Sequence, residues 1–336
     1  MSRPVRPSAV AAAAAFACVA GLQPAVTTGW LSAAQAANVF VLTNGAAPIY
    51  DEPAKVIQAG LTAPTNKIEI VDLGTLNLAQ AKARAAQIKA RNPDLVIALG
   101  DKAAFLADRE LAPAPVVFGM VANWENLGLN GLRATGVAME LEPETLASQV
   151  KMLLPNIHKV GVIYTQTSKA YVERVMMKAA TLELTFVPVF VTEAAEFRSA
   201  VAGQLERVDM FWLVEDPAIV TTENVKLLLE KSRDTNVVTL CSSPRLVAAG
   251  LTMAISVDPK VVGGQIADIA QGIIADPAAA HPPVATPDRA LISMNRQALD
   301  RLKIKLDPGL LAFVTLIDTG LEPRAPAPAP TSAAHR

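Results

Sequence analysis

Polar residues stand directly after most of the strand-like runs in this sequence, and their types could hold a small polar molecule. In DLVIALGDK, residues 94–102, a buried-strand pattern ends at Gly100 and a helical pattern begins at Asp101 and Lys102. The carboxyl ends of parallel strands meet at one edge of a sheet, where helices also begin, so side chains there can line a ligand site. We therefore predict a small-molecule binding site at these strand ends. The residues assigned to it are Asn44, Asp101, Lys102, Asn123, Tyr164, Thr165, Gln166, Asp216, Ser242, Ser243 and Asp258.

Several of these polar residues also have a purely structural interpretation, which the sequence leaves open. Asp101, Ser168 and Ser243 stand where helix caps are expected, and the proline after Ser243 favours a helix start. Asn44 with Gly45 is a turn signal by itself. For binding residues, we expect Asp101→Ala and Asp216→Ala to weaken ligand binding and to leave the melting temperature unchanged.

Three aromatic residues and one cysteine complete the candidate set. Trp124 and Tyr164 are candidates for apolar walls of the site, whereas Trp212, inside a strand-like run, is expected in the core. Cys241 ends another such run and is expected to be a buried structural thiol.

Motifs for catalysis are missing from the sequence. It contains no GxGxxG at a strand end, no GxxxxGK[ST] and no GxSxG. Its three histidines, His158, His281 and His335, share no helical face with carboxylates at metal-ligand spacing, so no metal or cofactor is predicted. Acid–base chemistry by the charged strand-end residues is the one enzymatic alternative, and binding without catalysis is expected.

The charge and composition indicate the class of protein. A formal net charge of −1 without a Lys/Arg cluster argues against a nucleic acid or an anionic membrane as the main partner. Hydrophobic residues make up 51% of the chain and aromatic residues only 4%. Aliphatic side chains thus dominate, which suits parallel strands covered by Ala- and Leu-rich helices.

Strand and helix patterns alternate through two halves of similar layout, which predicts an α/β fold of two doubly wound parallel-sheet lobes. Residues 37–141 with about 258–280 are assigned to the N-terminal lobe, and 142–257 with about 281–318 to the C-terminal lobe. The strands are expected at residues 38–45, 68–74, 95–100, 115–121 and 135–141, then at 159–165, 184–191, 210–215, 237–242 and 251–257, with a last strand and helix in 290–304.

The two ends of the chain differ from this pattern. Arg3 and Arg6 precede an uncharged apolar stretch at 9–22, and Ala34-Gln35-Ala36 offers a cleavage site, so residues 1–36 are predicted to be a secretory signal peptide. The mature protein would be periplasmic and would keep only Cys241, without an intrachain disulfide. Residues 322–336 are rich in Pro and Ala and are predicted to be disordered.

Several phrases of the sequence also occur in the order found in one known family. Residues 135–168 combine TGV, a helix ending in LLPN and the strand KVGVIY. DLVIALGDKAAFLA and PVVFGMVANWENLGL precede them, and VDMFWLVED, AAGLTMAISVDPKVVGGQIADIAQGII and ISMNRQALDRLKIKL follow. Over roughly residues 38–310 the chain resembles the periplasmic substrate-binding proteins of ABC transporters, in their tryptophan/tyrosine-binding-like group.

This resemblance implies a type I periplasmic binding protein fold, with a multi-strand hinge between lobes that close over a small ligand. It also implies a monomer that presents an amino-acid-like ligand or another small metabolite to an ABC permease in the inner membrane. A sensing or assembly module without a dedicated transporter is the alternative. The usual Thr after the strand-ending Gly is replaced here by Asp101-Lys102, the usual Asp falls near Asn123, and the usual Asn falls at Thr165. The resemblance therefore implies the fold but not the amino-acid specificity.

Overall fold

The structure is a computed structural model that describes residues 36–62, 66–129 and 133–319 of the 336-residue chain. Residues 1–35 of the expected signal peptide and the expected tail at 322–336 lie outside the described residues, whereas Ala36 is described. These described residues belong to one compact unit. Among the described helices, none combines the length and apolarity that crossing a membrane requires.

A five-stranded parallel sheet forms the first lobe, with strand order β2-β1-β3-β4-β5. Its strands are β1 (Asn38–Thr43), β2 (Lys67–Asp72), β3 (Leu95–Leu99), β4 (Val116–Gly119) and β5 (Ala134–Gly136). All five residues of the central strand β3 are buried, as expected of a parallel strand covered on both faces.

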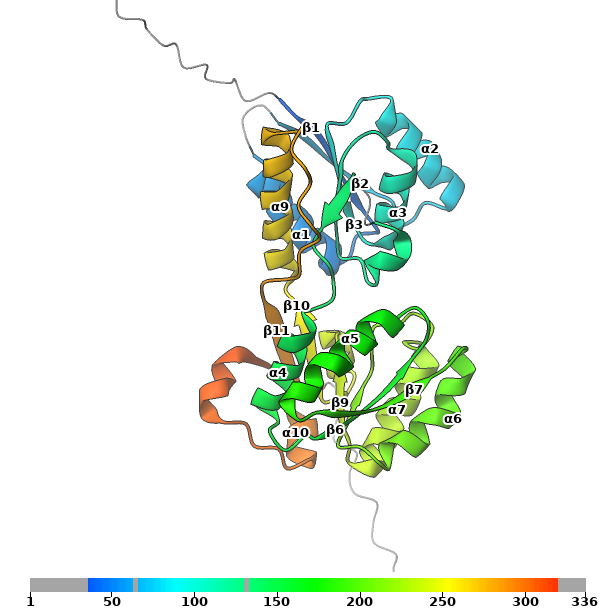
Figure 1. Cartoon of the computed structure of the whole chain (residues 1–336), viewed down its shortest axis with the longest axis vertical. Coiled ribbons are helices and arrows are strands. Elements are labelled where there is room, and N and C mark those ends of the chain that lie inside the picture. The colour runs from blue at the N-terminus through cyan, green and yellow to red at the C-terminus, as the bar shows by residue number, and fades with distance from the viewer. Residues whose placement is uncertain (1–35, 63–65, 130–132, 320–336) are drawn as a thin grey trace, which may run out of the picture. The chain divides into compact units, whose positions relative to one another are not determined.

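Helices cover both faces of this sheet (Figure 1). They are α1 (Pro48–Gly60), α2 (Leu78–Lys89), α3 (Asp101–Glu110) and α9 (Pro259–Ala275), with the 3₁₀ helix η1 (Trp124–Leu127) after β4. Helices α1 and α9 pack together on one face, and α2 and α3 lie on the other. The α2 helix starts with a capping box, in which Asn77 accepts from the Gln80 amide and Gln80 accepts from the Asn77 amide.

A seven-stranded sheet forms the second lobe, with order β12-β11-β10-β9-β8-β6-β7. Its strands are β6 (Lys159–Tyr164), β7 (Thr185–Phe190), β8 (Met210–Trp212), β9 (Val238–Cys241), β10 (Met253–Val257), β11 (Ala290–Asn295) and β12 (Val314–Ile317). All neighbours pair in parallel except β10 and β11. The two sheets with helices on their faces give the α/β fold of two doubly wound lobes that the sequence predicts.

The second sheet is also covered on both faces. Its helices are α4 (Pro143–Leu153), α5 (Lys169–Ala179), α6 (Ala194–Leu205), α7 (Thr222–Thr235), α8 (Pro244–Ala248) and α10 (Arg296–Arg301), with 3₁₀ helices η2 (Ala180–Leu182) and η3 (Pro308–Phe313). Residues of α4 and α5 share one apolar cluster with the first lobe, whereas α6, α7 and α8 enclose a separate cluster on the opposite face.

The chain passes between the lobes three times: from β5 to α4, from β10 to α9, and from α9 to β11. Around the first passage, the strand expected at 135–141 is shorter in the structure, because β5 ends at Gly136. Beyond that residue only Val137 makes a bridge, to Ala285 of the third passage. Strand β12, which the sequence reading did not include, extends the second sheet beside β11.

The turn after β3 has the geometry that its glycine permits. Gly100 has φ +98°, and a Cβ there would lie 2.5 Å from Cγ of Asn44, so both the backbone conformation and the space require glycine. Gly100 is the N-cap residue of α3 and Asp101 is its first helical residue, without a side-chain capping bond. The interpretation of Asp101 as a cap is therefore wrong. The Asn44 side chain caps α3 instead, since its Oδ1 accepts from the Ala103 amide at 2.8 Å.

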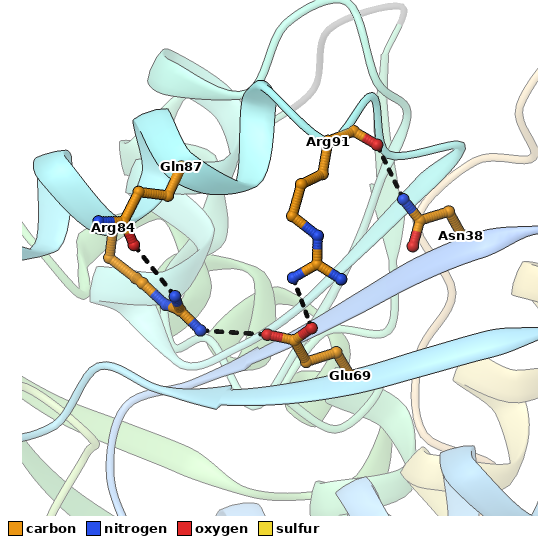
Figure 2. Close-up of polar contacts among 5 residues, drawn as sticks. All are labelled: Asn38, Glu69, Arg84, Gln87 and Arg91. Carbon is orange, nitrogen blue, oxygen red and sulfur yellow. Dashed lines mark hydrogen bonds and ion pairs between the residues drawn. The ribbon is translucent and has the colours of Figure 1, made fainter.

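A charged cluster lies between the edge strand β2 and the helix α2 of this lobe (Figure 2). Glu69 accepts from Arg84 at 3.1 Å and from Arg91 at 2.6 Å, while Arg84 also donates to Gln87. Asn38 donates to the carbonyl of Arg91 at 2.9 Å. Each charge has a partner and the side chains are partly exposed, so the cluster is an ordinary surface ion network.

Candidate functional site

A cavity of about 500 Å³ lies among the carboxyl ends of strands from both sheets. Its lining comes from the start of α1, the loop after β4, the passage from β5 to α4, α5, and the ends of β8, β9 and β10. Most of the lining is apolar, and the volume is typical of sites for small organic ligands. The larger apolar residues are Ile49, Met120, Met139, Leu141, Leu146, Tyr171, Trp212, Val214, Ile255, Val257 and Leu291.

Two aromatic residues form one wall of this cavity. Trp212 is 5% exposed and packs edge-on against Tyr171, with ring centroids 6.0 Å apart, and against Phe186 at 6.1 Å. The Tyr171 hydroxyl donates to the Leu141 carbonyl at 2.9 Å, which fixes the ring, and its burial raises the pKa of the hydroxyl. Trp212 thus belongs to the core, as expected, and also faces the cavity, which the sequence reading missed.

The aromatic residues expected as walls lie elsewhere. Tyr164 is buried against Phe190, with centroids 5.6 Å apart, and does not line the cavity. Trp124 stacks on Phe118 at 5.7 Å and lines two smaller hollows beside η1. Tyr164 and Trp124 thus pack against aromatic residues of their own lobes and do not line the cavity.

Polar groups gather where the loop after β4 meets the second lobe. Asn123 has φ 50°, in the left-handed region that asparagine tolerates, and its amide donates to the Glu140 carboxylate. The Asn123 side chain donates to the Glu215 carbonyl at 3.3 Å. The Glu215 carboxylate accepts from the Ser242 hydroxyl. All four residues line the cavity, so Asn123 and Ser242 are the predicted site residues that contact its acidic groups.

Two further contacts beside this point join the same loop to α5 and to the turn before it. Arg174 forms an ion pair with Glu125 at 3.1 Å, and Asn126 donates to the Thr167 carbonyl at 2.8 Å. Together with the contact between Asn123 and Glu215, they hold the loop after β4 against the second lobe next to the cavity.

Asp101 lies exposed at the start of α3, close to these acidic groups. Partial burial of its carboxylate raises its pKa, the Ala122 amide that donates to it acts in the opposite direction, and the charge of Glu215 raises the pKa further. Burial raises the pKa of the Tyr50 hydroxyl, and the charge of the Asp101 carboxylate raises it further. Asp101 is therefore near the cavity rim, although it is not among the lining residues.

Asp216 forms a buried hydrogen-bond knot behind the cavity wall. Its carboxylate is 0% exposed and accepts from the Thr165 hydroxyl at 2.7 Å, the Ser168 hydroxyl at 2.6 Å, and the amides of Thr165 and Ala218 at 3.2 and 3.0 Å. All of its bonds go to the protein, and the knot ties the turn after β6 to the turn after β8. Asp216 and Thr165 are thus placed to hold these turns, and the expectation of unchanged stability for Asp216→Ala is withdrawn.

Other predicted site residues also bond to the protein itself. The Lys102 ammonium donates to the carbonyls of Leu73 and Leu76, the latter at 2.6 Å. Asp258 caps α9 by accepting from the Lys260 amide at 2.9 Å. Neither Lys102 nor Asp258 lines the cavity, and neither does Asn44, which caps α3.

The last two predicted residues follow strand ends. Gln166 is exposed in the turn after β6. Ser243 lines the cavity and is the N-cap residue of the short α8 helix, without a capping bond from its side chain. Ser168 likewise starts α5 without such a bond, because its hydroxyl donates to Asp216. The capping interpretation is therefore wrong for the side chains of both serines.

Glu52, Glu140 and Tyr171 are among the titratable lining residues that were not predicted. None follows a strand-like run directly, since Glu52 and Tyr171 lie inside helices and Glu140 lies in the passage between lobes. The one available signal was Glu140, a charged residue inside the apolar run VAMEL. Among the described residues, no group of His, Cys, Asp and Glu has a geometry that could hold a metal ion.

Cys241 borders the cavity but is expected to be chemically inert. It is fully buried, which raises the pKa of its thiol to about 12, and the Ser243 carbonyl accepts from its Sγ at 3.4 Å. In a chain with Cys18 changed to serine, a disulfide reagent at pH 8 should label less than about a tenth of the thiol before unfolding, because the thiolate is the reactive form. Complete labelling in denaturant is the control, and rapid labelling of the native protein would show an exposed, ionisable thiol.

Comparisons with known proteins agree with this architecture. The family model described as ABC transporter substrate binding protein matches residues 47–315. No curated protein matches the chain significantly. The solved structures with similar folds include an ABC domain in complex with L-Trp from Streptococcus pneumonia, with 20% identity, a TM-score of 0.63, and coverage of 84% of this chain and 100% of that one.

Two further structures have the same fold. A ligand-free, open substrate-binding protein with adhesive properties from Clostridium difficile is 15% identical with a TM-score of 0.71, covering 84% of this chain and 99% of that one. A solute-binding protein from Agrobacterium vitis with bound allitol is 12% identical with a TM-score of 0.51, covering 80% and 99%. At these identities the likeness extends to the fold of two lobes.

Proposed function

This chain belongs to the family of ABC transporter substrate-binding proteins, and on that premise we propose that it captures a small ligand in the cavity between its sheets and presents it to an ABC permease. Binding is reversible and makes no covalent bond. The family consists of solute-binding proteins rather than enzymes.

The observation that carries this proposal is the cavity itself. It draws its lining from both lobes at the carboxyl ends of their strands, where α/β sheets place ligands. Apolar walls can bury the body of a small molecule, while Asn123, Glu140, Glu215 and Ser242 supply polar groups that orient it.

The same proposal includes export and a ligand-dependent change between lobes. The basic start and apolar stretch of residues 1–36 support secretion to the periplasm, where the protein acts as a monomer. A ligand that contacts both lobes favours the arrangement in which both sets of contacts are made. A permease can then distinguish the occupied from the empty protein.

A thermal-shift screen of amino acids, amines, nucleosides, sugars and small carboxylates tests this function. A ligand present at about a hundred times its dissociation constant stabilises the folded state by about 2.7 kcal/mol, so the melting temperature should rise with ligand concentration. The increase should be small in a Ser242→Leu variant, whose larger side chain occupies part of the cavity. A screen in which no compound raises the melting temperature, or in which Ser242→Leu responds fully, contradicts capture in this cavity.

A further inference from the structure

The cavity lining carries more negative than positive charge. Glu52, Glu140 and Glu215 line it, against a single cation, Arg245, and of these residues Glu215 and Arg245 are exposed. Glu52 is partly neutralised by Lys260 at 3.4 Å. Within the described part of the chain, neither Glu140 nor Glu215 forms an ion pair. The cavity is thus an apolar chamber with two carboxylates that have no cationic partner.

Of these two carboxylates, Glu140 gives the stronger indication of a bound cation. Its Oε1 accepts from the Asn123 amide, whereas its Oε2 is buried and has no hydrogen-bond partner among the described residues. Burial raises its pKa, and the nearby charges act in opposite directions: Arg174 lowers the pKa and Glu125 raises it. The ion pair of Arg174 is with Glu125 and not with Glu140.

An unpaired buried carboxylate is costly, and a cation that enters the site offsets that cost. The torsion that turns a Glu carboxylate is soft, so Glu140 can present either oxygen to a bound group. Glu215 lines the same cavity: its backbone carbonyl accepts from the Asn123 side chain, and its carboxylate accepts from the Ser242 hydroxyl. An apolar cavity with two carboxylates in its lining is suited to a protonated amino group.

The described lining offers fewer groups for a ligand of the opposite charge. A ligand carboxylate needs a cation or free donors, and the amide of Asn123 is already used by Glu140. Lys102, the cation that the sequence reading assigned to the site, donates to backbone carbonyls outside the lining. Arg245 is left as the single cation, at an exposed position.

We propose that the ligand is an organic amine without a carboxylate, whose ammonium group binds Glu140 in a lining to which Glu215 adds negative charge, and whose apolar body packs against Trp212 and Tyr171. This inference rests on the proposed function, because it assigns a ligand class to the same cavity. Aromatic faces also attract cations, which adds to the preference for an ammonium group over a carboxylate.

Calorimetric titration of the full chain with two matched series tests the inference. The first series is tryptamine, L-tryptophan and indole-3-propionate, and the second is isopentylamine, L-leucine and 4-methylpentanoate. In at least one series the amine should bind about tenfold or more tightly than the zwitterion, and the acid should bind most weakly, since hydrogen bonds to charged groups and unpaired charges decide the order. The inference is overturned if, in each series that binds, the zwitterion or the acid binds as tightly as its amine.

Two variants place the effect on Glu140. Glu140→Gln keeps the size and removes the charge, so it should weaken the amine by about tenfold or more. Glu69→Gln is the matched control on the surface cluster of β2, and it should leave amine affinity unchanged. Unaltered amine affinity in Glu140→Gln overturns the inference.

The outcomes also separate this inference from the proposed function. If a sugar, a nucleoside or an amino acid binds, this binding is lost in Ser242→Leu, and no amine binds more tightly, the proposed function is kept and the amine is overturned. The absence of binding by every compound of both series and of the screen overturns both.

Discussion

Asp216→Ala is expected to lower the free energy of unfolding by about 3 kcal/mol or more, one of the largest effects of any polar substitution in the protein. The substitution leaves two hydroxyls and two amides without their acceptor in a site that water does not reach. Thr165 and Ser168 would lose the bonds that hold the turn after β6. Chemical denaturation of the two proteins measures the difference directly.

A matched control is available at the other end of β8. Asp209 also accepts from two amides of a neighbouring segment, those of His158 at 3.0 Å and Lys159 at 2.8 Å, but it is exposed. Water can replace its bonds, so Asp209→Ala should cost about 1 kcal/mol or less. Equal losses for the two variants, or a loss below about 1 kcal/mol for Asp216→Ala, would show that the buried knot does not stabilise the fold.

The fold could be predicted because most local sequence patterns correspond to the strands and helices of the structure. Apolar runs such as 95–99 became buried parallel strands, and the helix expected after Gly100 begins at Asp101. The patterns did not indicate β12, whose residues are half-buried or exposed at the sheet edge and so lack a strong apolar signal. They also extended the strand at 135–141 too far, because its end depends on which neighbours exist beyond Gly136.

The site was harder to predict because position after a strand does not determine where a side chain points. Asp216 and Glu215 are adjacent in the sequence, yet Asp216 is fully buried behind the wall and Glu215 lines the cavity. Lys102 is equally well placed by its sequence position, but backbone carbonyls of the loop after β2 take its donors. These choices depend on loops far away in the sequence, which no local pattern reveals.

The chemical character of the cavity also depends on residues that do not come directly after a strand, and the expectation that site residues follow strands does not find them. Glu140 comes from the passage between lobes and Tyr171 from the face of α5. The loop after β4 and the turn before α5 meet beside the cavity, joined by the hydrogen bond from Asn126 to the Thr167 carbonyl. A search for charged residues inside apolar runs would have found Glu140 and would have missed Tyr171.

Trp212→Ala is expected to abolish most ligand binding and to destabilise the protein by about 3–5 kcal/mol, the usual cost of removing a large aromatic side chain from a core. Trp212 supplies a wall of the cavity and also supports Tyr171 and Phe186 through edge-on contacts. Its loss removes contact area for the ligand and lets the Tyr171 ring move. Affinity for the most stabilising compound of the screen should fall by about tenfold or more, which corresponds to about 1.4 kcal/mol.

The neighbouring residue separates the two effects of this substitution. Phe211 precedes Trp212 in β8 and points to the opposite face of the sheet, where it is fully buried against Phe197 with centroids 6.1 Å apart. Phe211→Ala should therefore cost a similar free energy of unfolding and leave ligand affinity close to that of the wild type. The milder pair Trp212→Phe and Phe211→Leu gives the same contrast if the alanine variants fail to fold. Parallel losses of affinity in both variants would mean that Trp212 acts only through stability, and that the cavity it lines is not where the ligand binds.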